Sequence, residues 1–373
     1  MVRKCLFNPT LKAVNLFDRS LVPYGLLRTG VAPDHPEVKH TAATWSGIGE
    51  NEKFNFYGGV NIGANDHLFS WTQNHLSLTE LCQTHHAVLL ANGAYKSRRL
   101  GLTNSNRVLS AQSIVGQYNN DPFLTGEIVQ YGGKVGLVGG GNVALDVARL
   151  LLNYTHESIV ESDISYQFRS SLLPTTEGTI SFTSELNPTL VHFFIRRSPF
   201  DLPCTTRELR ELLTIPNVHL KLSGLNGQPL HQMDQYKKLQ KSRDLSSRKT
   251  KRLLKLLADK EKHDLNEKVT SSTKLVKFHF HHKPSSIIEA NDQLEVLLES
   301  TSGNGEKKIN LNYLIESLGY DPTPVDKLDD INRETGRAKF NDETVYLAGW
   351  ALSGAKGVVG DSTESARMAV ERK

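Results

Sequence analysis

The sequence has little cysteine: only Cys5, Cys82 and Cys204 occur among 373 residues. They lie far apart and form no C-x-x-C pair, which excludes a disulfide scaffold and a thiolate zinc site and is typical of a reducing compartment. The sequence also lacks any run of about 18 uncharged apolar residues, the length that a membrane-spanning helix needs. A membrane-spanning helical protein is therefore excluded.

The sequence also lacks a large excess of one charge, because it has 44 basic and 40 acidic residues and a net charge of +4. Residues 237–262 are the exception, with eleven Lys or Arg against three acids, so the rest of the chain is net acidic. One basic segment on an acidic body indicates a docking site for a negatively charged partner, and argues against a nucleic-acid binder. A solvated helix face is the alternative interpretation.

Residues 1–18 contain no glycine, and the first glycine is Gly25. Ala13–Phe17 is predicted to be a strand that ends at Asp18. An acid at this place is typical of a ribose-binding residue, which follows a dinucleotide fingerprint by about 20 residues. If this region belongs to a nucleotide domain, its opening strand and phosphate loop are not part of the printed sequence.

One glycine-rich fingerprint is present. The apolar run Lys134–Val138 predicts a strand, the sequence Gly139–Ala144 (GGGNVA) follows, and Leu145–Leu152 has helical periodicity. In this strand–loop–helix context G-x-G-x-x-A indicates a dinucleotide site, in which Gly139 permits the tight turn and Gly141 lets the backbone approach a pyrophosphate. A glycine turn without a ligand is the alternative.

The end of the next predicted strand indicates which nucleotide binds. Val191–Ile195 runs directly into Arg196 and Arg197. An acid there would bind the free 2′-hydroxyl of NAD, whereas arginine pairs with the 2′-phosphate of NADP. The arginines favour NADP, and the alternative is a surface pair with no ligand.

Two apolar runs, Val88–Ala91 and Leu314–Leu318, each end in a glycine turn, and the segment between them has α/β character. The length favours two domains. We predict a discontinuous domain at 1–94 and 319–373, and an inserted domain at 95–318 that carries a polar, basic insertion at about 225–274.

Several segments resemble the adrenodoxin reductase family, the mitochondrial NADPH–ferredoxin oxidoreductases. The two longest are Leu21–Lys39 (LVPYGLLRTGVAPDHPEVK) and Gly141–Arg149 (GNVALDVAR). The other matches, in the order of the family, are Arg196-Arg197 with Glu208–Glu211, Gly319-Tyr320 with Pro324–Asp326, and Gly349-Trp350 with Gly354 and Gly357–Val359.

The resemblance implies an α/β fold of two Rossmann-like dinucleotide-binding domains, with the NADP domain inserted into the FAD domain. It implies an FAD-dependent enzyme that takes hydride from NADPH and passes single electrons to an acidic two-iron two-sulfur ferredoxin of the adrenodoxin type. The cofactors perform the redox chemistry, so no catalytic side-chain nucleophile is expected. A monomer in the mitochondrial matrix or on the inner-membrane surface is also implied.

The family's binding positions can be placed on this sequence. FAD contacts fall on Asp18, Leu26, Ile62, Trp350, Gly357, Val358 and Val359. NADP contacts fall on Gly140, Gly141, Asn142, Val143, Arg196, Arg197 and Glu208, with Gly357 shared. Ferredoxin contacts fall on Arg210, Arg248 and Arg252. Asp34 and His35 would lie near the flavin, where His35 either makes a structural hydrogen bond or handles a proton.

The sequence departs from the family pattern at the absent FAD phosphate loop, at Ala355-Lys356 in place of Pro and Thr, and at Gln117 in place of Trp. The absent loop supports a second function: a flavin-free remnant that binds NADP or ferredoxin without turnover. A relationship to the reductase subunit of glutamate synthase ranks low, because that family lacks the run Ala32–Pro36. Alternating His279 and His281, with His282, are interpreted as strand histidines and not as a metal site.

Overall fold

The computed structural model describes Leu6 and residues 10–371, except for 46, 64–73, 123–132, 154–187, 243, 245, 304, 323–324 and 358. The chain divides into two compact units. Unit 1 comprises Met1–Arg28, Glu37–Arg98 and Gly319–Lys373, and unit 2 comprises Thr29–Pro36 and Arg99–Leu318. The short segment Thr29–Pro36 thus groups with unit 2, although its neighbours on both sides belong to unit 1.

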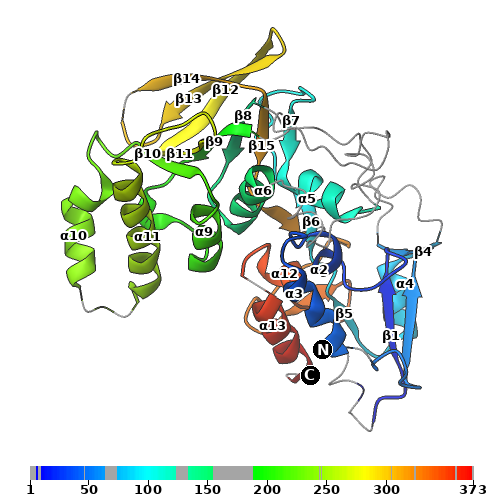
Figure 1. The fold of residues 1–373 in the computed structure, drawn as a ribbon. Helices are drawn as coiled ribbons and strands as arrows, with labels where there is room; N and C mark the ends of the chain where they lie inside the picture. Colours follow the sequence, from blue (N-terminus) through cyan, green and yellow to red (C-terminus); the bar gives the residue numbers. More distant parts are fainter. Residues whose placement is uncertain are drawn as a thin grey trace, which may run out of the picture. The chain divides into compact units, whose positions relative to one another are not determined.

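Unit 2 is built on a six-stranded parallel sheet (Figure 1). Its strands, in spatial order, are β10 (Val218–Ser223), β11 (Lys274–Phe280), β9 (Pro188–Ile195), β8 (Gly133–Val138), β15 (Tyr313–Glu316) and β7 (Val108–Ser110). From β8 the chain continues to β9 on one side, while β15 lies on the other side. In parallel sheets ligands bind outside the carboxyl ends of the strands at such a switch of direction.

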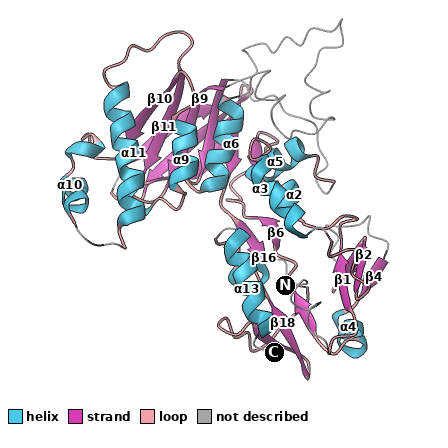
Figure 2. Cartoon of the chain, turned by 60° about the horizontal axis from the view of Figure 1, so that its bottom comes forward, coloured by secondary structure: helices cyan, strands magenta, loops and turns pink. Residues whose placement is uncertain are grey.

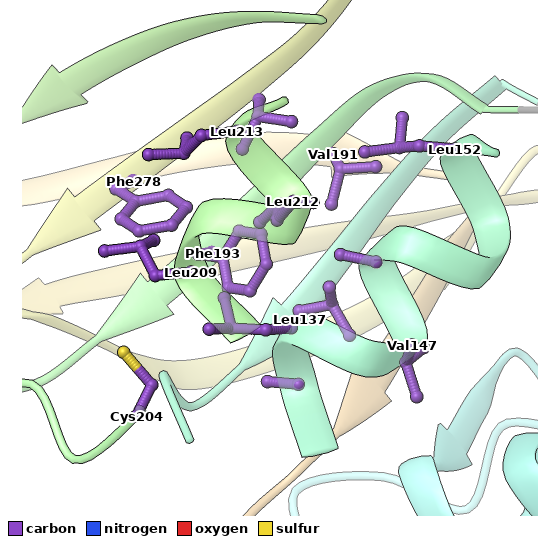
Figure 3. Packing of buried hydrophobic residues seen from close by; sticks show 14 of the residues in the cluster. Leu137, Val147, Leu152, Val191, Phe193, Cys204, Leu209, Leu212, Leu213 and Phe278 are labelled. Atoms are coloured by element: carbon purple, nitrogen blue, oxygen red, sulfur yellow. The ribbon is translucent and has the colours of Figure 1, made fainter. Parts of the chain in front are cut away.

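Helices cover one face of this sheet (Figure 2). They are α5 (Ala111–Asn119), α6 (Asn142–Leu152), α9 (Thr206–Leu213) and α11 (Arg248–Asp264), and α10 (Asp234–Lys241) precedes α11. Figure 3 shows the core between these layers, where Phe193 and Phe278 from neighbouring strands meet Leu209 and Leu212 of α9. The two phenyl rings are 4.6 Å apart between centroids. The apolar stripes of the helices therefore close the core on this side.

An antiparallel meander covers part of the opposite face. It consists of β12 (His282–Ala290), β13 (Gln293–Ser300) and β14 (Glu306–Leu311). Leu294, Val296 and Leu298 of β13 are buried in a cluster with Phe194 and Leu314 of the parallel sheet. The alternation of these residues with Glu295 and Glu299 is the period of two that a half-buried strand requires.

Unit 1 contains smaller sheets. Parallel pairs join β1 (Val14–Asp18) to β2 (Phe54–Gly58) and β3 (Val60–Ile62) to β4 (Asn74–Leu76), and an antiparallel pair joins β6 (Ala94–Ser97) to β16 (Tyr320–Pro322). A three-stranded sheet has the order β17 (Arg337–Phe340), β18 (Glu343–Leu347), β5 (Val88–Leu90). The other helices are α2 (Leu26–Thr29), α3 (Pro36–Lys39), α4 (Leu78–Thr84), α12 (Trp350–Ser353) and α13 (Val359–Glu371), and 3-10 helices occur at His40–Trp45, Pro199–Asp201 and Leu230–Gln232.

Several local predictions are confirmed. The strand that ends at Asp18, the strand before the glycine loop and the helix after it are all present. The predicted basic insertion is largely helical, since it contains α10 and the long helix α11. Among the described residues, no helix has the length and apolar character needed to span a bilayer.

Candidate functional site

The glycine loop sits between β8 and α6 in a turn that requires glycine. Gly139 has φ +119°, and a Cβ atom there would lie 2.4 Å from the carbonyl oxygen of Ser317. The Gly139 amide donates to the Phe194 carbonyl of β9 at 3.0 Å, and the Ser317 amide donates to the Val138 carbonyl at 2.9 Å. The loop is therefore held between the carboxyl ends of the strands on both sides of β8.

The N-terminus of α6 is open. Gly141 is its N-cap residue, no side chain caps the helix, and a Cβ atom built on Gly141 would meet nothing within 4 Å. The Asn142 side chain is turned away to accept the Thr205 amide at 2.7 Å, which ties α6 to the start of α9. The first amides of a helix lack intrahelical partners and carry the positive end of its dipole, so this end suits a phosphate group.

Two arginines follow β9 at the same edge of the sheet. Arg196 and Arg197 are both exposed. Their backbone is fixed, because the Arg196 carbonyl accepts the Thr301 hydroxyl at 2.6 Å and the Arg197 carbonyl accepts the His281 amide at 3.2 Å. None of the ion pairs among the described residues uses either guanidinium group. Their charge is available to an anionic ligand.

A buried ionic cluster lies beside α6 within unit 2. Arg149, only 4% exposed, contacts Asp34 through Nε to Oδ2 at 2.5 Å and through a second nitrogen at 3.1 Å. Its other terminal nitrogen, Nη1, lies 3.0 Å from Asp146, 3.1 Å from Glu208 and 3.4 Å from Glu211. One guanidinium thus connects four carboxyl groups from α6, α9 and the segment Thr29–Pro36.

Asp146 is the carboxyl group of this cluster whose pKa its surroundings raise. Burial raises the pKa of Asp146 well above its usual value, Arg149 opposes this, and a hydrogen bond with Glu208 raises it further. Burial alone would lower the pKa of Arg149, but its contacts with Asp34 and Asp146 raise it. The surroundings therefore favour the protonated form of Asp146 and the charged form of Arg149.

His35 completes the cluster. Its Nε2 lies 2.8 Å from Glu211 and 4.0 Å from Glu208, and the ring is buried. The structure brings His35 together with Glu208, one of the predicted NADP contacts. Sequence reasoning singled out Asp34, His35 and Glu208 but gave no role to Asp146, Arg149 or Glu211. Their only signal was that they lie within the family-like segments Gly141–Arg149 and Glu208–Glu211.

The predicted FAD positions lie on separate elements of unit 1. Asp18 ends β1, and its side chain accepts the Ser20 amide at 2.9 Å. Burial raises the pKa of Asp18, against the lowering effect of that hydrogen bond and of Arg19. Leu26 is in α2 and Ile62 is in β3, and both are half-buried.

The remaining FAD positions come from the C-terminal part of unit 1. The Trp350 ring stacks on Tyr320 at 6.1 Å, and its Nε1 donates to the Lys356 carbonyl at 3.0 Å. Gly357 has φ +82°, and a Cβ atom there would lie 2.3 Å from the Asp361 carboxylate. Val359 begins α13, whereas Val358 lies outside the described residues.

The residues present in unit 1 fit FAD only in part. Asp18 has the place of a ribose-binding acid at the end of a parallel strand. No G-x-G-x-x-G occurs in the printed sequence of unit 1. The residues described there therefore include no counterpart of the phosphate cradle that unit 2 presents.

The predicted ferredoxin contacts are all exposed. Arg210 lies on α9, and Arg248 and Arg252 lie on α11. Leu253, Leu254 and Leu257 on the other side of α11 are buried. The basic face of α11 therefore points to solvent.

Comparisons with known proteins identify relatives over nearly the whole chain, although no family model matches. The probable mitochondrial NADPH:adrenodoxin oxidoreductase of Schizosaccharomyces pombe is 30% identical over 94% of this chain and 74% of its own length. The Drosophila melanogaster NADPH:adrenodoxin oxidoreductase is 30% identical, covering 93% and 71%. The Arabidopsis thaliana enzyme is 27% identical, covering 93% and 73%.

A solved structure shows the same fold. Mycobacterium tuberculosis FprA, in complex with NADPH, matches with a TM-score of 0.78 and 24% identity over 99% of this chain and 79% of FprA. The mixed α/β architecture is thus that of FprA. Together with the 30% identity to the curated enzymes, this shows that the chain belongs to the NADPH:adrenodoxin oxidoreductase family.

Proposed function

We propose that this chain is an FAD-dependent reductase that takes hydride from NADPH and passes single electrons to an adrenodoxin-type two-iron two-sulfur ferredoxin. The observation that carries the proposal is the open N-terminus of α6 behind the strained Gly139 turn, with Arg196 and Arg197 at the same sheet edge. Such a pairing of phosphate loop and arginines supports NADPH as the hydride donor.

We assign NADP binding to residues 95–318. Amides at the start of α6, including those of Asn142 and Val143, would bind the pyrophosphate beside Gly140 and Gly141. Arg196 and Arg197 would bind the 2′-phosphate. Glu208, fixed by Arg149, would face the cofactor as the family pattern implies. The His35 ring is held by Glu211 at 2.8 Å, which supports a structural hydrogen bond as its first role.

We assign FAD binding to residues 1–94 and 319–373. Asp18 would accept a ribose hydroxyl, and Leu26, Ile62, Trp350 and Gly357–Val359 would bind the rest of the cofactor. Bound FAD supplies the conversion of a two-electron hydride into single electrons. Because the described residues of unit 1 include no phosphate cradle, flavin binding is the step of this proposal that most needs a test.

The electron acceptor would dock on Arg210, Arg248 and Arg252, since exposed arginines attract and orient an acidic partner. The three relatives compared above are NADPH:adrenodoxin oxidoreductases named as mitochondrial, which supports the same partner class and location for this chain. A monomer is sufficient for this arrangement, because every residue invoked comes from one chain.

The test is the visible absorption spectrum of the purified chain, before and after FAD is added, followed by NADPH without oxygen. We expect a flavin spectrum that NADPH bleaches and that an added ferredoxin restores. The Gly141→Val variant is the control, because it should still take up flavin while losing the bleaching by NADPH. A folded protein that takes up no flavin would contradict the reductase proposal.

A second function is favoured by one observation, which is that the open N-terminus of α6 and the exposed Arg196 and Arg197 all lie within unit 2. In that case the chain binds NADP or a ferredoxin without flavin and without turnover. The same experiment separates the two functions, since a remnant of this kind would bind NADPH in a titration but stay colourless with FAD.

A further inference from the structure

Four lysines gather on the sheet face of unit 2 that the helices do not cover. In the register of the parallel strands Lys221 of β10 pairs with Lys277 of β11, and Lys277 pairs with His192 of β9. In-register neighbours on parallel strands point to the same face. Lys134 of β8 belongs to this face too, because it lies two residues before Gly136, the partner of His192.

The fourth lysine comes from the meander. Lys307 of β14 pairs with Leu298, which is buried against the parallel sheet, so Lys307 points to the same side. We call Lys134, Lys221, Lys277 and Lys307 the four-lysine face. Burial lowers the pKa of Lys277, and the charges of Lys221, Lys307 and Lys134 lower it further, in agreement with their place on the same face. Lys277 is half-buried and the other three are exposed.

The four-lysine face has no counter-charge among the described residues. None of the ion pairs found there includes any of the four, whereas neighbouring Lys283 and Lys308 pair with Glu299 and Glu295 on the outer side of the meander. Glu267, near the β10 edge, is engaged by His219 at 3.2 Å. Like charges directly opposite each other on adjacent strands are destabilising, so an external anion would relieve this repulsion.

The side chains beside the four lysines on this sheet face, those of His192, His279 and Ser223, are polar and uncharged. His192 Nδ1 and His279 Nε2 are 2.8 Å apart, and the other nitrogen of His279 lies 2.8 Å from the Ser223 hydroxyl. Burial, followed by the nearby lysines, lowers the pKa of His192 to about 4 and that of His279 to about 3. The histidine pair therefore supplies no negative charge that would balance the lysines.

We propose that the four-lysine face binds a soluble oligophosphate anion. Lys221 and Lys277 stand on adjacent strands, which are about 4.8 Å apart, so their charges fit a compact multivalent anion. None of the exposed large apolar side chains of the described residues lies on β8, β9, β10, β11 or β14, which disfavours a lipid surface. The site lies on the face of the sheet, whereas the glycine loop lies at the carboxyl end of β8, and it does not rest on the proposed reductase activity.

The test is calorimetric titration of the full chain with inorganic tripolyphosphate at low salt, with NADP⁺ saturating so that the dinucleotide site is blocked. We expect one binding event that the double variant Lys221→Gln/Lys277→Gln weakens at least about tenfold, the size expected for lost charge-assisted contacts. Lys307→Gln should weaken binding, and Lys308→Gln, one residue away on the opposite side of β14, should not.

Absence of binding, or equal losses in Lys307→Gln and Lys308→Gln, would overturn the proposal. Folding of the double variant is checked by its melting temperature without ligand, which should be unchanged or higher because repulsion is removed. Sedimentation with phosphatidylglycerol vesicles should leave the protein in solution. Vesicle binding that depends on the same lysines would overturn the choice of a soluble anion.

Discussion

The two units present the residues proposed to bind nucleotides in different ways. In unit 2, strand β8, the glycine loop and helix α6 follow one another within Gly133–Leu152, and most of their side chains are buried. In unit 1, strand β1 is only half-buried along its whole length, and the predicted cofactor residues are spread from Asp18 to Val359. The proposed phosphate site of unit 2 therefore lies within one short segment, whereas the proposed FAD positions of unit 1 are scattered along the chain.

Because of this difference, the proposed site of unit 2 can be predicted from the sequence alone, whereas that of unit 1 cannot. A phosphate loop depends on backbone amides and on glycines in consecutive residues, so its pattern is local. A site made of side chains from distant elements has no such pattern. We therefore expect substitutions in unit 2 to give large, separable effects on stability and on nucleotide binding.

The largest expected effect is that of Arg149→Met. The substitution leaves Asp34, Asp146, Glu208 and Glu211 without their shared cation in a buried site, and breaking a buried pair in this way costs about 3–5 kcal/mol. Denaturant unfolding measures the loss, and hydrogen exchange should place it in α6 and α9 of unit 2. The matched control is Arg207→Met, which removes an exposed pair with Glu211 and should cost less than about 1 kcal/mol. Equal losses in both variants would contradict the role of Arg149.

Acidification should destabilise unit 2 through the histidine pair. The pKa of His192 falls from 6.5 to about 4 on folding, so its contribution is complete above pH 6.5 and is lost as pH falls to about 4. By linkage this amounts to about 3 kcal/mol for His192 alone. The raised pKa of Asp146 has the opposite effect, because it makes the folded state more stable as the pH falls. The measurement therefore has to separate the contribution of the histidines from that of Asp146.

The comparison variant is His192→Leu/His279→Leu, which replaces both hydrogen-bonding partners and keeps Asp146. We expect the stability of the natural chain, minus that of the variant, to fall between pH 6.5 and pH 4 in urea titrations. The contribution of Asp146 is common to both proteins and cancels. A difference that stays constant with pH would show that the pair is not held neutral.

A smaller, local effect is expected from Gly141→Val. A side chain at Gly141 meets no protein atom within 4 Å, so the fold should tolerate it, but it occupies the approach to the α6 amides. We expect NADPH affinity to fall about a hundredfold with an unchanged melting temperature, since several charge-assisted hydrogen bonds are lost. Gly303→Ala, in equally open surroundings, is the control for both measurements. Unchanged affinity in Gly141→Val would remove the phosphate site from this loop.

The smallest effect concerns the basic face of α11. The double variant Arg248→Gln/Arg252→Gln should slow ferredoxin association several-fold at low salt, with the difference vanishing as salt increases, because exposed charges act mainly on encounter. Lys238→Gln on α10 removes another exposed charge and should have little effect. The association rates of the two variants with ferredoxin are measured by stopped flow. Equal effects of the α11 and α10 substitutions would show that ferredoxin does not dock on the basic face of α11.

The parts of the fold that the sequence predicted share one property, which is that their patterns are short. The glycine loop and the arginine pair after β9 each lie within a few residues, and the structure has them where they were expected. The resemblance of Leu21–Lys39 to the family pointed to the region of Asp34 and His35. It did not show that Thr29–Pro36, within this segment, groups with unit 2.

The ionic cluster and the four-lysine face could not be predicted in this way. Arg149 meets Asp34 across 115 positions and Glu208 across 59, and no periodicity states which carboxyl groups will meet. Likewise Lys221 faces Lys277 only because β11 lies between β10 and β9, an order that depends on the whole chain. Long-range pairing, and not local propensity, places these residues together.

A calorimetric titration of the purified chain with NADPH and with NADH tests whether unit 2 holds a complete NADP site. We predict one NADPH site, at least about tenfold tighter than for NADH, and loss of that preference in Arg196→Gln/Arg197→Gln. Equal affinity for the two nucleotides, or no binding of either by the folded chain, would contradict the account.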